Sequence, residues 1–196
     1  MKIPNYACQK GEVKLAYEFI DLEIEGPILI KPNIFYDHRG FFMETYTQKD
    51  FEEHEIKQEF VQDNHSWSVK NTLRGLHFQK SPYTQVKLIR CISGEILDVA
   101  VDLRKKSSTF GKHIKVTLSS ENNAMLYLPE GFAHGFLVLS DYAAVIYKVS
   151  KYYNKDANSG IIWNDPDLKI EWPIQNPLLS DKDSRWSRLS EIKVNL

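Results

Sequence analysis

The sequence has few cysteines and no long apolar run, and each shortage excludes a class of protein. Its two cysteines, Cys8 and Cys91, lie far apart and form no Cys-x-x-Cys pair, so we predict neither a disulfide framework nor a zinc knuckle. No apolar stretch approaches the roughly 18 residues of a membrane-spanning helix, and residues 1–14 lack the apolar region of a secretion signal. These absences predict a protein of the reducing cytoplasm that has no membrane partner.

The chain also lacks an excess of charge of either sign. Lysine and arginine total 25 residues against 26 aspartates and glutamates, which leaves a net charge of −1. This balance gives no general attraction to nucleic acid, so an anionic ligand must be met by local charge. The chain also lacks a Gly-x-Gly-x-x-Gly run for binding a dinucleotide, and we expect no redox cofactor.

Length and composition indicate one globular domain. The chain has 196 residues, of which 42% are hydrophobic. This is enough for a substantial core that needs no disulfide bonds. Residues 1–18 mix polar and apolar side chains without a sustained period, and we interpret them as an N-terminal extension. The domain itself is then expected to span residues 19–196.

Short strands dominate the second half of the chain. Residues 86–92 and 95–103 have the character of strands and flank Ser93-Gly94, which predicts a hairpin with a two-residue turn. Further strands are expected at residues 113–118, 125–128, 135–139 and 143–149. Short strands at this spacing are typical of an all-β sandwich or barrel.

Two finer features are predicted from local patterns. Only short peripheral helices are expected: one at residues 47–56, where Thr47 and Asp50 resemble a capping box, and one at residues 180–192. In the strand at 95–103, alternation predicts one packed face and one face that carries carboxylates, among them Asp98.

Residues 71–79 and the strand that follows contain groups suited to removing a proton from carbon. His77 has a side chain of near-neutral pKa that can act as a base, and Lys87 can stabilise the resulting negative oxygen. Lys87 and Tyr147 each share a strand face with apolar residues, so both are predicted to point inward.

The spacing of Arg74 and His77 raises a question of geometry. Residues three apart in an ideal strand face opposite sides. Gly75 lies between them, however, and a glycine in a strand often marks a bulge that resets the alternation. We therefore expect that the two side chains can share one site.

Five segments, taken in order, resemble one known family. They are Asp37-His38-Arg39-Gly40 with Phe41-Phe42, Gln62-Asp63-Asn64-His65-Ser66, Arg74-Gly-Leu-His-Phe-Gln79, Pro129-Glu-Gly-Phe-Ala-His134-Gly-Phe136 and Leu179-Ser-Asp-Lys-Asp183. Together they are similar to the dTDP-4-dehydrorhamnose 3,5-epimerase family, over about residues 27–190. The resemblance implies a cupin-type jelly roll with a few short peripheral helices, which works as a homodimer and needs no metal or other cofactor.

The resemblance also implies roles for single side chains on a dTDP-linked 4-keto-6-deoxy sugar. His77 matches the catalytic base, Asp183 the carboxylate paired with it, Tyr147 the acid on the opposite face of the sugar, and Lys87 the lysine near the C4 oxygen. Substrate-binding positions are matched by Arg39, Glu44, Gln62, Asp63, Asn64, Arg74, His134, Tyr153 and Lys182, with Tyr153 as the residue that stacks on thymine. The implied reaction inverts C3 and C5 of dTDP-4-dehydro-6-deoxy-D-glucose through enolates and gives dTDP-4-dehydro-L-rhamnose.

Structural interpretations of the same residues stay open. A lone strand histidine such as His77 is more often a hydrogen-bonded structural residue than a base. Asp183 stands three residues after Ser180 and can be the partner in a helix cap. Tyr147 can be an ordinary strand aromatic with its hydroxyl at the rim of the sheet.

Other functions are alternatives as well. A metal-binding cupin would use His77, His134 and Asp98, but the segment after His77 lacks the usual His-x-His pair, which disfavours a metal. The remaining alternatives are a non-catalytic sugar-nucleotide binder and an epimerase that acts at C3 or C5 alone, on a sugar linked to another nucleotide such as GDP or CDP. Asn158 stands where some relatives of the family carry a glutamate, which puts one substrate contact in question.

Overall fold

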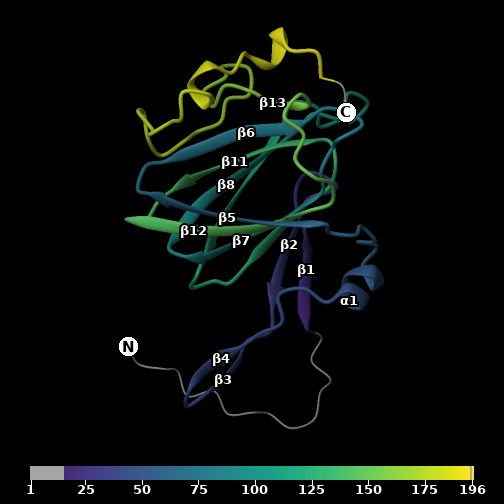
Figure 1. Cartoon of the computed structure of the whole chain (residues 1–196), viewed down its shortest axis with the longest axis vertical. Coiled ribbons are helices and arrows are strands. Elements are labelled where there is room, and N and C mark those ends of the chain that lie inside the picture. Colours follow the sequence, from purple (N-terminus) through teal and green to yellow (C-terminus); the bar gives the residue numbers. More distant parts are fainter. Residues whose placement is uncertain (1–15, 195) are drawn as a thin grey trace.

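The structure is a computed structural model that describes residues 16–194 and 196 (Figure 1). Two antiparallel sheets face each other and form a sandwich, which confirms the all-β prediction. Most of the predicted extension lies outside the described residues, so its boundary at residue 18 stays a prediction. Among the described residues, no helix is long and apolar enough to cross a membrane.

The strands are divided between two large sheets and one separate hairpin. The first sheet has the order β1 (Tyr17–Asp21), β2 (Ile28–Pro32), β10 (Met125–Leu128), β7 (Lys87–Ser93), β12 (Tyr142–Val149) and β5 (Gln62–Val69). The second has the order β13 (Asn158–Gly160), β6 (Leu73–Gln79), β11 (Phe132–Val138), β8 (Glu95–Asp102) and β9 (His113–Ser119). The hairpin of β3 (Phe35–Asp37) and β4 (Gly40–Phe42) extends away from both sheets (Figure 1).

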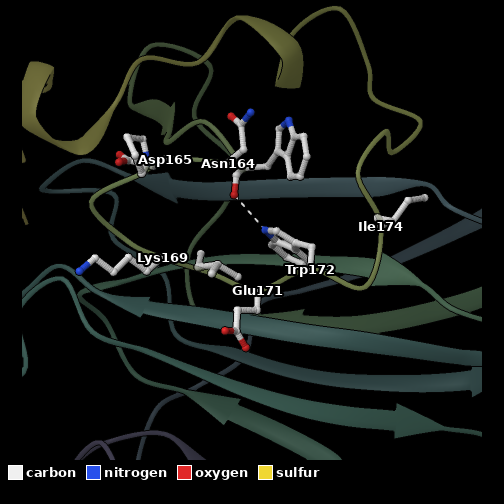
Figure 2. A pocket seen from close by; sticks show the side chains of 9 residues that line it. Asn164, Asp165, Lys169, Glu171, Trp172 and Ile174 are labelled. Carbon is white, nitrogen blue, oxygen red and sulfur yellow. Dashed lines mark hydrogen bonds between the residues drawn. The ribbon is translucent and has the colours of Figure 1, made fainter.

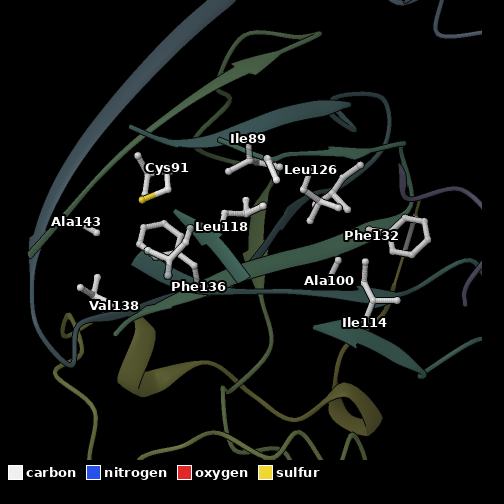
Figure 3. Close-up of a cluster of buried hydrophobic side chains, with 14 of the residues drawn as sticks. Ile89, Cys91, Ala100, Ile114, Leu118, Leu126, Phe132, Phe136, Val138 and Ala143 are labelled. Carbon is white, nitrogen blue, oxygen red and sulfur yellow. The ribbon is translucent and has the colours of Figure 1, made fainter. Parts of the chain in front are cut away.

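The main core lies between the two sheets. Ile89 and Cys91 from β7 pack in one cluster with Ala100 from β8 and Phe136 from β11 (Figure 3). Burial raises the pKa of the Cys91 thiol to about 11, so it behaves as a small apolar side chain at neutral pH. Both strands predicted for residues 86–103 are present, but the predicted hairpin is wrong because β7 and β8 lie in different sheets and do not pair. Gly94, with its positive φ of +75°, turns the chain from one sheet to the other.

A second cluster covers the outer face of the five-stranded sheet. Val99 and Val101 of β8 pack there against Ile161, Leu168 and Val194 of the C-terminal segment, which runs over β6 in Figure 1. One face of β8 packs and the other carries carboxylates, as expected, and both faces are buried. The carboxylate face, which includes Asp98, lies between the sheets and is fully buried there.

Both predicted helices are shorter than expected. Helix α1 covers Gln48–Glu53, and the Thr47 hydroxyl makes no cap bond and donates to Glu44 Oε2 at 3.3 Å. The C-terminal tail forms two short 3-10 helices, η1 (Asp183–Arg185) and η2 (Leu189–Glu191), rather than one helix. Trp186, between them, has extended backbone angles, which interrupts the helical pattern.

The expected bulge at Gly75 is present. In the pairing of β6 with β11, His77 lies opposite His134 while Arg74 lies opposite Phe136, with a shift of register between them. Residues 134 and 136 share a face, so their partners His77 and Arg74 share it too. The φ of Gly75 is +143°, and a Cβ there would lie 2.5 Å from the Cα of Gly135, so only glycine fits.

Candidate active site

The His77 side chain is held by a carboxylate from the C-terminal segment. His77 Nε2 lies 2.5 Å from Asp183 Oδ1, although the two residues are 106 positions apart in sequence. Burial opposes the ionisation of Asp183, but the hydrogen bonds that it accepts from His77 and Trp186 outweigh that effect, so its pKa lies below the usual range. Asp183 is therefore a carboxylate at neutral pH.

This pairing determines which nitrogen of His77 is free. A carboxylate only accepts hydrogen bonds, so the proton of a neutral imidazole must be on Nε2. The lone pair is then on Nδ1, where a base can take up a proton. Asp183 also fixes the orientation of the ring.

A second histidine–aspartate pair lies behind the first. His134 of β11 places Nε2 2.9 Å from both carboxylate oxygens of Asp98, and both residues are buried. Desolvation lowers the pKa of His134 despite the Asp98 charge, so this imidazole is held neutral. The charges of Lys87 and His77 also act on His134, which places all four groups in one interior cluster.

Lys87 and Tyr147 face this cluster from the opposite sheet, as predicted. Burial lowers the pKa of Lys87 to about 8, and the Asp98 carboxylate partly opposes that shift. Burial raises the pKa of Tyr147, while the charge of Arg74 acts in the other direction. At neutral pH the site therefore contains a mostly protonated amine and a fully protonated phenol.

Some of the predicted substrate-binding residues contact one another, and one of them, Asn64, lies directly opposite Tyr147 in the pairing of β5 with β12. Gln62 Nε2 donates to Asn64 Oδ1 at 2.7 Å, and Gln62 Oε1 accepts from the backbone N–H of Tyr153 at 3.4 Å. The Tyr153 ring is exposed, as a stacking platform must be. Asp63 differs, because it lies on the outer face of the sheet and forms an ion pair with Lys148 at 3.0 Å.

Two predicted residues are not brought to the cluster within this chain. Arg39 lies on the β3–β4 hairpin, where its guanidinium pairs with Asp37 at 2.6 Å, and Glu44 follows that hairpin. Figure 1 shows the hairpin at the far end of the molecule from β6. Lys182 is the residue before Asp183 and is exposed, with its ammonium 5.3 Å from the centre of the Trp186 ring.

Sequence reasoning missed one residue of the site and misassigned another. Trp186 donates its indole N–H to Asp183 Oδ1 at 3.2 Å, and nothing in its sequence context predicted that contact. Asp98 was considered only as a metal ligand, whereas it holds His134. Its position on a strand face with apolar neighbours was the available signal, because a buried carboxylate requires a partner.

A cavity of about 400 Å³ lies elsewhere and has different chemistry (Figure 2). A single loop forms it, with Trp163, Asp165, Lys169, Glu171 and Trp172 among the lining side chains, and no predicted site residue takes part. Among the described residues, no group of three or more histidine, cysteine or carboxylate side chains is placed to hold a metal ion.

Comparison with known proteins points to one family. A model of the dTDP-4-dehydrorhamnose 3,5-epimerase family matches residues 21–191. The dTDP-4-dehydrorhamnose 3,5-epimerase of Shigella flexneri is 58% identical over 165 residues, which cover 84% of this chain and 91% of that protein.

Solved structures agree with this match. The crystal structure of dTDP-6-deoxy-D-glucose-3,5-epimerase from Legionella pneumophila in complex with dTDP-4-keto-L-rhamnose has a TM-score of 0.87 and 44% identity, covering 90% of this chain and 95% of that one. A 3'-monoepimerase from Streptomyces bikiniensis, in complex with dTDP-quinovose, has a TM-score of 0.82 and 36% identity, covering 87% of each chain. These similarities confirm the cupin-type jelly roll.

Proposed function

The chain belongs to the dTDP-4-dehydrorhamnose 3,5-epimerase family, and from that premise we infer that it inverts C3 and C5 of dTDP-4-dehydro-6-deoxy-D-glucose to give dTDP-4-dehydro-L-rhamnose. It is an isomerase. Within this chain, the observation that carries the assignment is the hydrogen bond between His77 of β6 and Asp183 of η1. It provides an oriented base in the same cluster as a half-buried lysine and a half-buried tyrosine.

The reaction begins with loss of a proton next to a ketone. In a 4-keto sugar the hydrogens on C3 and C5 are both α to the carbonyl, so removing either one gives an enolate. We propose that Nδ1 of His77 takes this proton and that Asp183 stabilises the imidazolium that forms. Lys87, mostly protonated at neutral pH, would stabilise the negative charge that develops on the C4 oxygen.

Inversion then requires a proton from the other face of the ring. Tyr147 lies on β12 in the sheet opposite His77, and burial raises its pKa, so its phenol retains a proton to give. We propose Tyr147 as this acid. His134 is held neutral by burial and oriented by Asp98, which suits a hydrogen-bonding contact to the sugar rather than a second charge.

We further propose that the protein works as a homodimer. Arg39 and Glu44, which resemble nucleotide-binding residues, lie on or beside the β3–β4 hairpin, far from His77 of the same chain (Figure 1). The hairpin exposes Phe35, Phe41 and Phe42, an apolar surface that a second copy would cover. The hairpin of one copy would then complete the nucleotide site of the other.

Proton NMR in D2O tests the proposed reaction. Purified protein is incubated with dTDP-4-dehydro-6-deoxy-D-glucose, and deuterium is followed into C3 and C5 while a reductase traps the product. We expect exchange at both carbons, and a loss of about 100-fold or more in His77→Asn and Tyr147→Phe. A chelator should leave the rate unchanged. Exchange at one carbon would indicate a mono-epimerase, and none at either would contradict the proposal.

A further inference from the structure

Trp186 contacts the catalytic pair directly and has no role in the mechanism described so far. We propose that Trp186 is a positioning residue that tunes the basicity of His77 through a second hydrogen bond to the carboxylate oxygen that His77 uses. This inference rests on the proposed function, because it assumes that His77 is the base.

The geometry places two donors on one oxygen atom. Asp183 Oδ1 accepts from His77 Nε2 at 2.5 Å and from Trp186 Nε1 at 3.2 Å. The indole also meets the imidazole edge-on, with ring centres 6.1 Å apart and an interplanar angle of 68°. Trp186 therefore touches both members of the pair, through a polar contact to one and a ring contact to the other.

The indole is fixed in this position by its surroundings. A Cβ on Gly160 of β13 would lie 2.5 Å from the Trp186 ring, so the absence of a side chain at residue 160 makes room for it. The ammonium of Lys182 lies 5.3 Å from the ring centre on one face. The backbone of the next residue, Ser187, accepts a hydrogen bond from Ile162 at 3.0 Å, which ties this loop to the sheet.

Sharing one oxygen between two donors has a predictable electrostatic effect. A donor to a carboxylate stabilises its negative charge and leaves less of it to attract a proton on the neighbouring imidazole. Without the indole N–H, Asp183 would stabilise the His77 imidazolium more strongly, and the pKa of His77 would rise. A base with a higher pKa is protonated, and therefore inactive, over a wider range of acidic pH.

Other charged groups near His77 would stay in place when Trp186 is changed. His134 of β11 lies directly opposite His77. The charges of Asp98 on β8 and Lys87 on β7 act on the imidazole of His134. Lys182 contacts the indole ring and not its N–H. A Trp186→Phe substitution keeps a smaller aromatic ring and removes the donor, so a shift in the pKa of His77 reports on the hydrogen bond when a stronger donor at the same position shifts it in the opposite direction.

The experiment compares Trp186→Phe with a matched control, Trp172→Phe. Trp172 also donates its indole N–H, to the Trp163 carbonyl at 2.9 Å, but lies outside the site. We expect the acid limb of kcat/KM in Trp186→Phe to move up by about 0.5 unit, which is roughly a threefold loss near pH 6 relative to pH 9. Trp172→Phe should keep the wild-type limb.

Two further measurements make each outcome decisive. NMR titration of the His77 ring gives its pKa without turnover, so an inactive wild type would overturn the proposed function and leave the test of Trp186 intact. Incorporation of 5-fluorotryptophan, whose N–H is a stronger donor, should lower the pKa of His77 without changing the fold. A uniform loss of rate with an unshifted His77 pKa would show that Trp186 only packs, and the inference would be wrong.

Discussion

Lys87 is a cation held in a largely apolar interior, and its protonation controls the proposed enolate step. Burial lowers its pKa to about 8, so the fraction of charged lysine falls as the pH rises through that value. We predict that kcat/KM falls on an alkaline limb near pH 8. Lys87→Met should lose about 100-fold or more at all pH values. Lys87→Arg, if it keeps measurable activity, should show no such limb, since arginine stays charged.

The Asp98 carboxylate acts on both His134 and Lys87, so neutralising it should affect both side chains. In Asp98→Asn, His134 keeps a hydrogen-bond acceptor but loses its anionic partner, and Lys87 loses the charge that raises its pKa. We predict that the alkaline limb of kcat/KM moves to lower pH, measured on purified variants. Asp141→Asn, which removes an exposed ion pair with Lys70, is the matched control and should leave the limb in place.

Ordered motifs were sufficient to predict that His77 and Asp183 form a pair, but not which residues support that pair. His77 and Asp183 were found because each belongs to a short motif with a fixed place in the family order, and the structure brings them together. The contact of Trp186 depends on how the C-terminal loop folds over β13, which no local period encodes. The roles assigned to the individual site residues stay predictions until variants are measured.

At the scale of elements, strand β6 depends on a backbone position that accepts only glycine. A Cβ at Gly75 would lie 2.5 Å from Gly135 Cα, and the φ of +143° disfavours any other residue. We predict that Gly75→Ala lowers the free energy of unfolding by about 3 kcal/mol or more. Denaturant unfolding of Gly111→Ala provides the control, since Gly111 has a φ of +77° but nothing within 4 Å of a Cβ. An equal loss in both variants would contradict the steric explanation.

The strands were predictable because their period is local, whereas the helices were not. Alternation and the Ser93-Gly94 turn predicted β7 and β8 nearly to the residue. The helix at 47–56 and the tail at 180–192 were overestimated, because Thr47 makes no cap bond to the helix and the extended backbone of Trp186 interrupts the tail. The Thr47 hydroxyl instead interacts with Glu44 and Tyr17.

At the scale of the whole molecule, the proposed dimer makes a prediction that a single chain cannot satisfy. Arg39→Ala and His77→Asn should each be nearly inactive alone. If the hairpin of one copy serves the other, co-expression gives heterodimers with one intact site, and about a quarter of wild-type activity returns. Activity assays of separately purified and co-expressed variants measure this. No recovery, although heterodimers form, would place both residues in a single-chain site. The cytoplasmic location stays a prediction from the sequence.

His77 and Asp183 belong to parts of the molecule that differ in how easily they unfold locally. The base is on β6, inside a sheet, while the carboxylate is on η1, a short turn of the C-terminal segment outside the two sheets. Segments outside the sheets open locally at a lower cost than the core requires to unfold. On heating, the enzyme should therefore stop working before it melts, and on cooling it should recover without refolding.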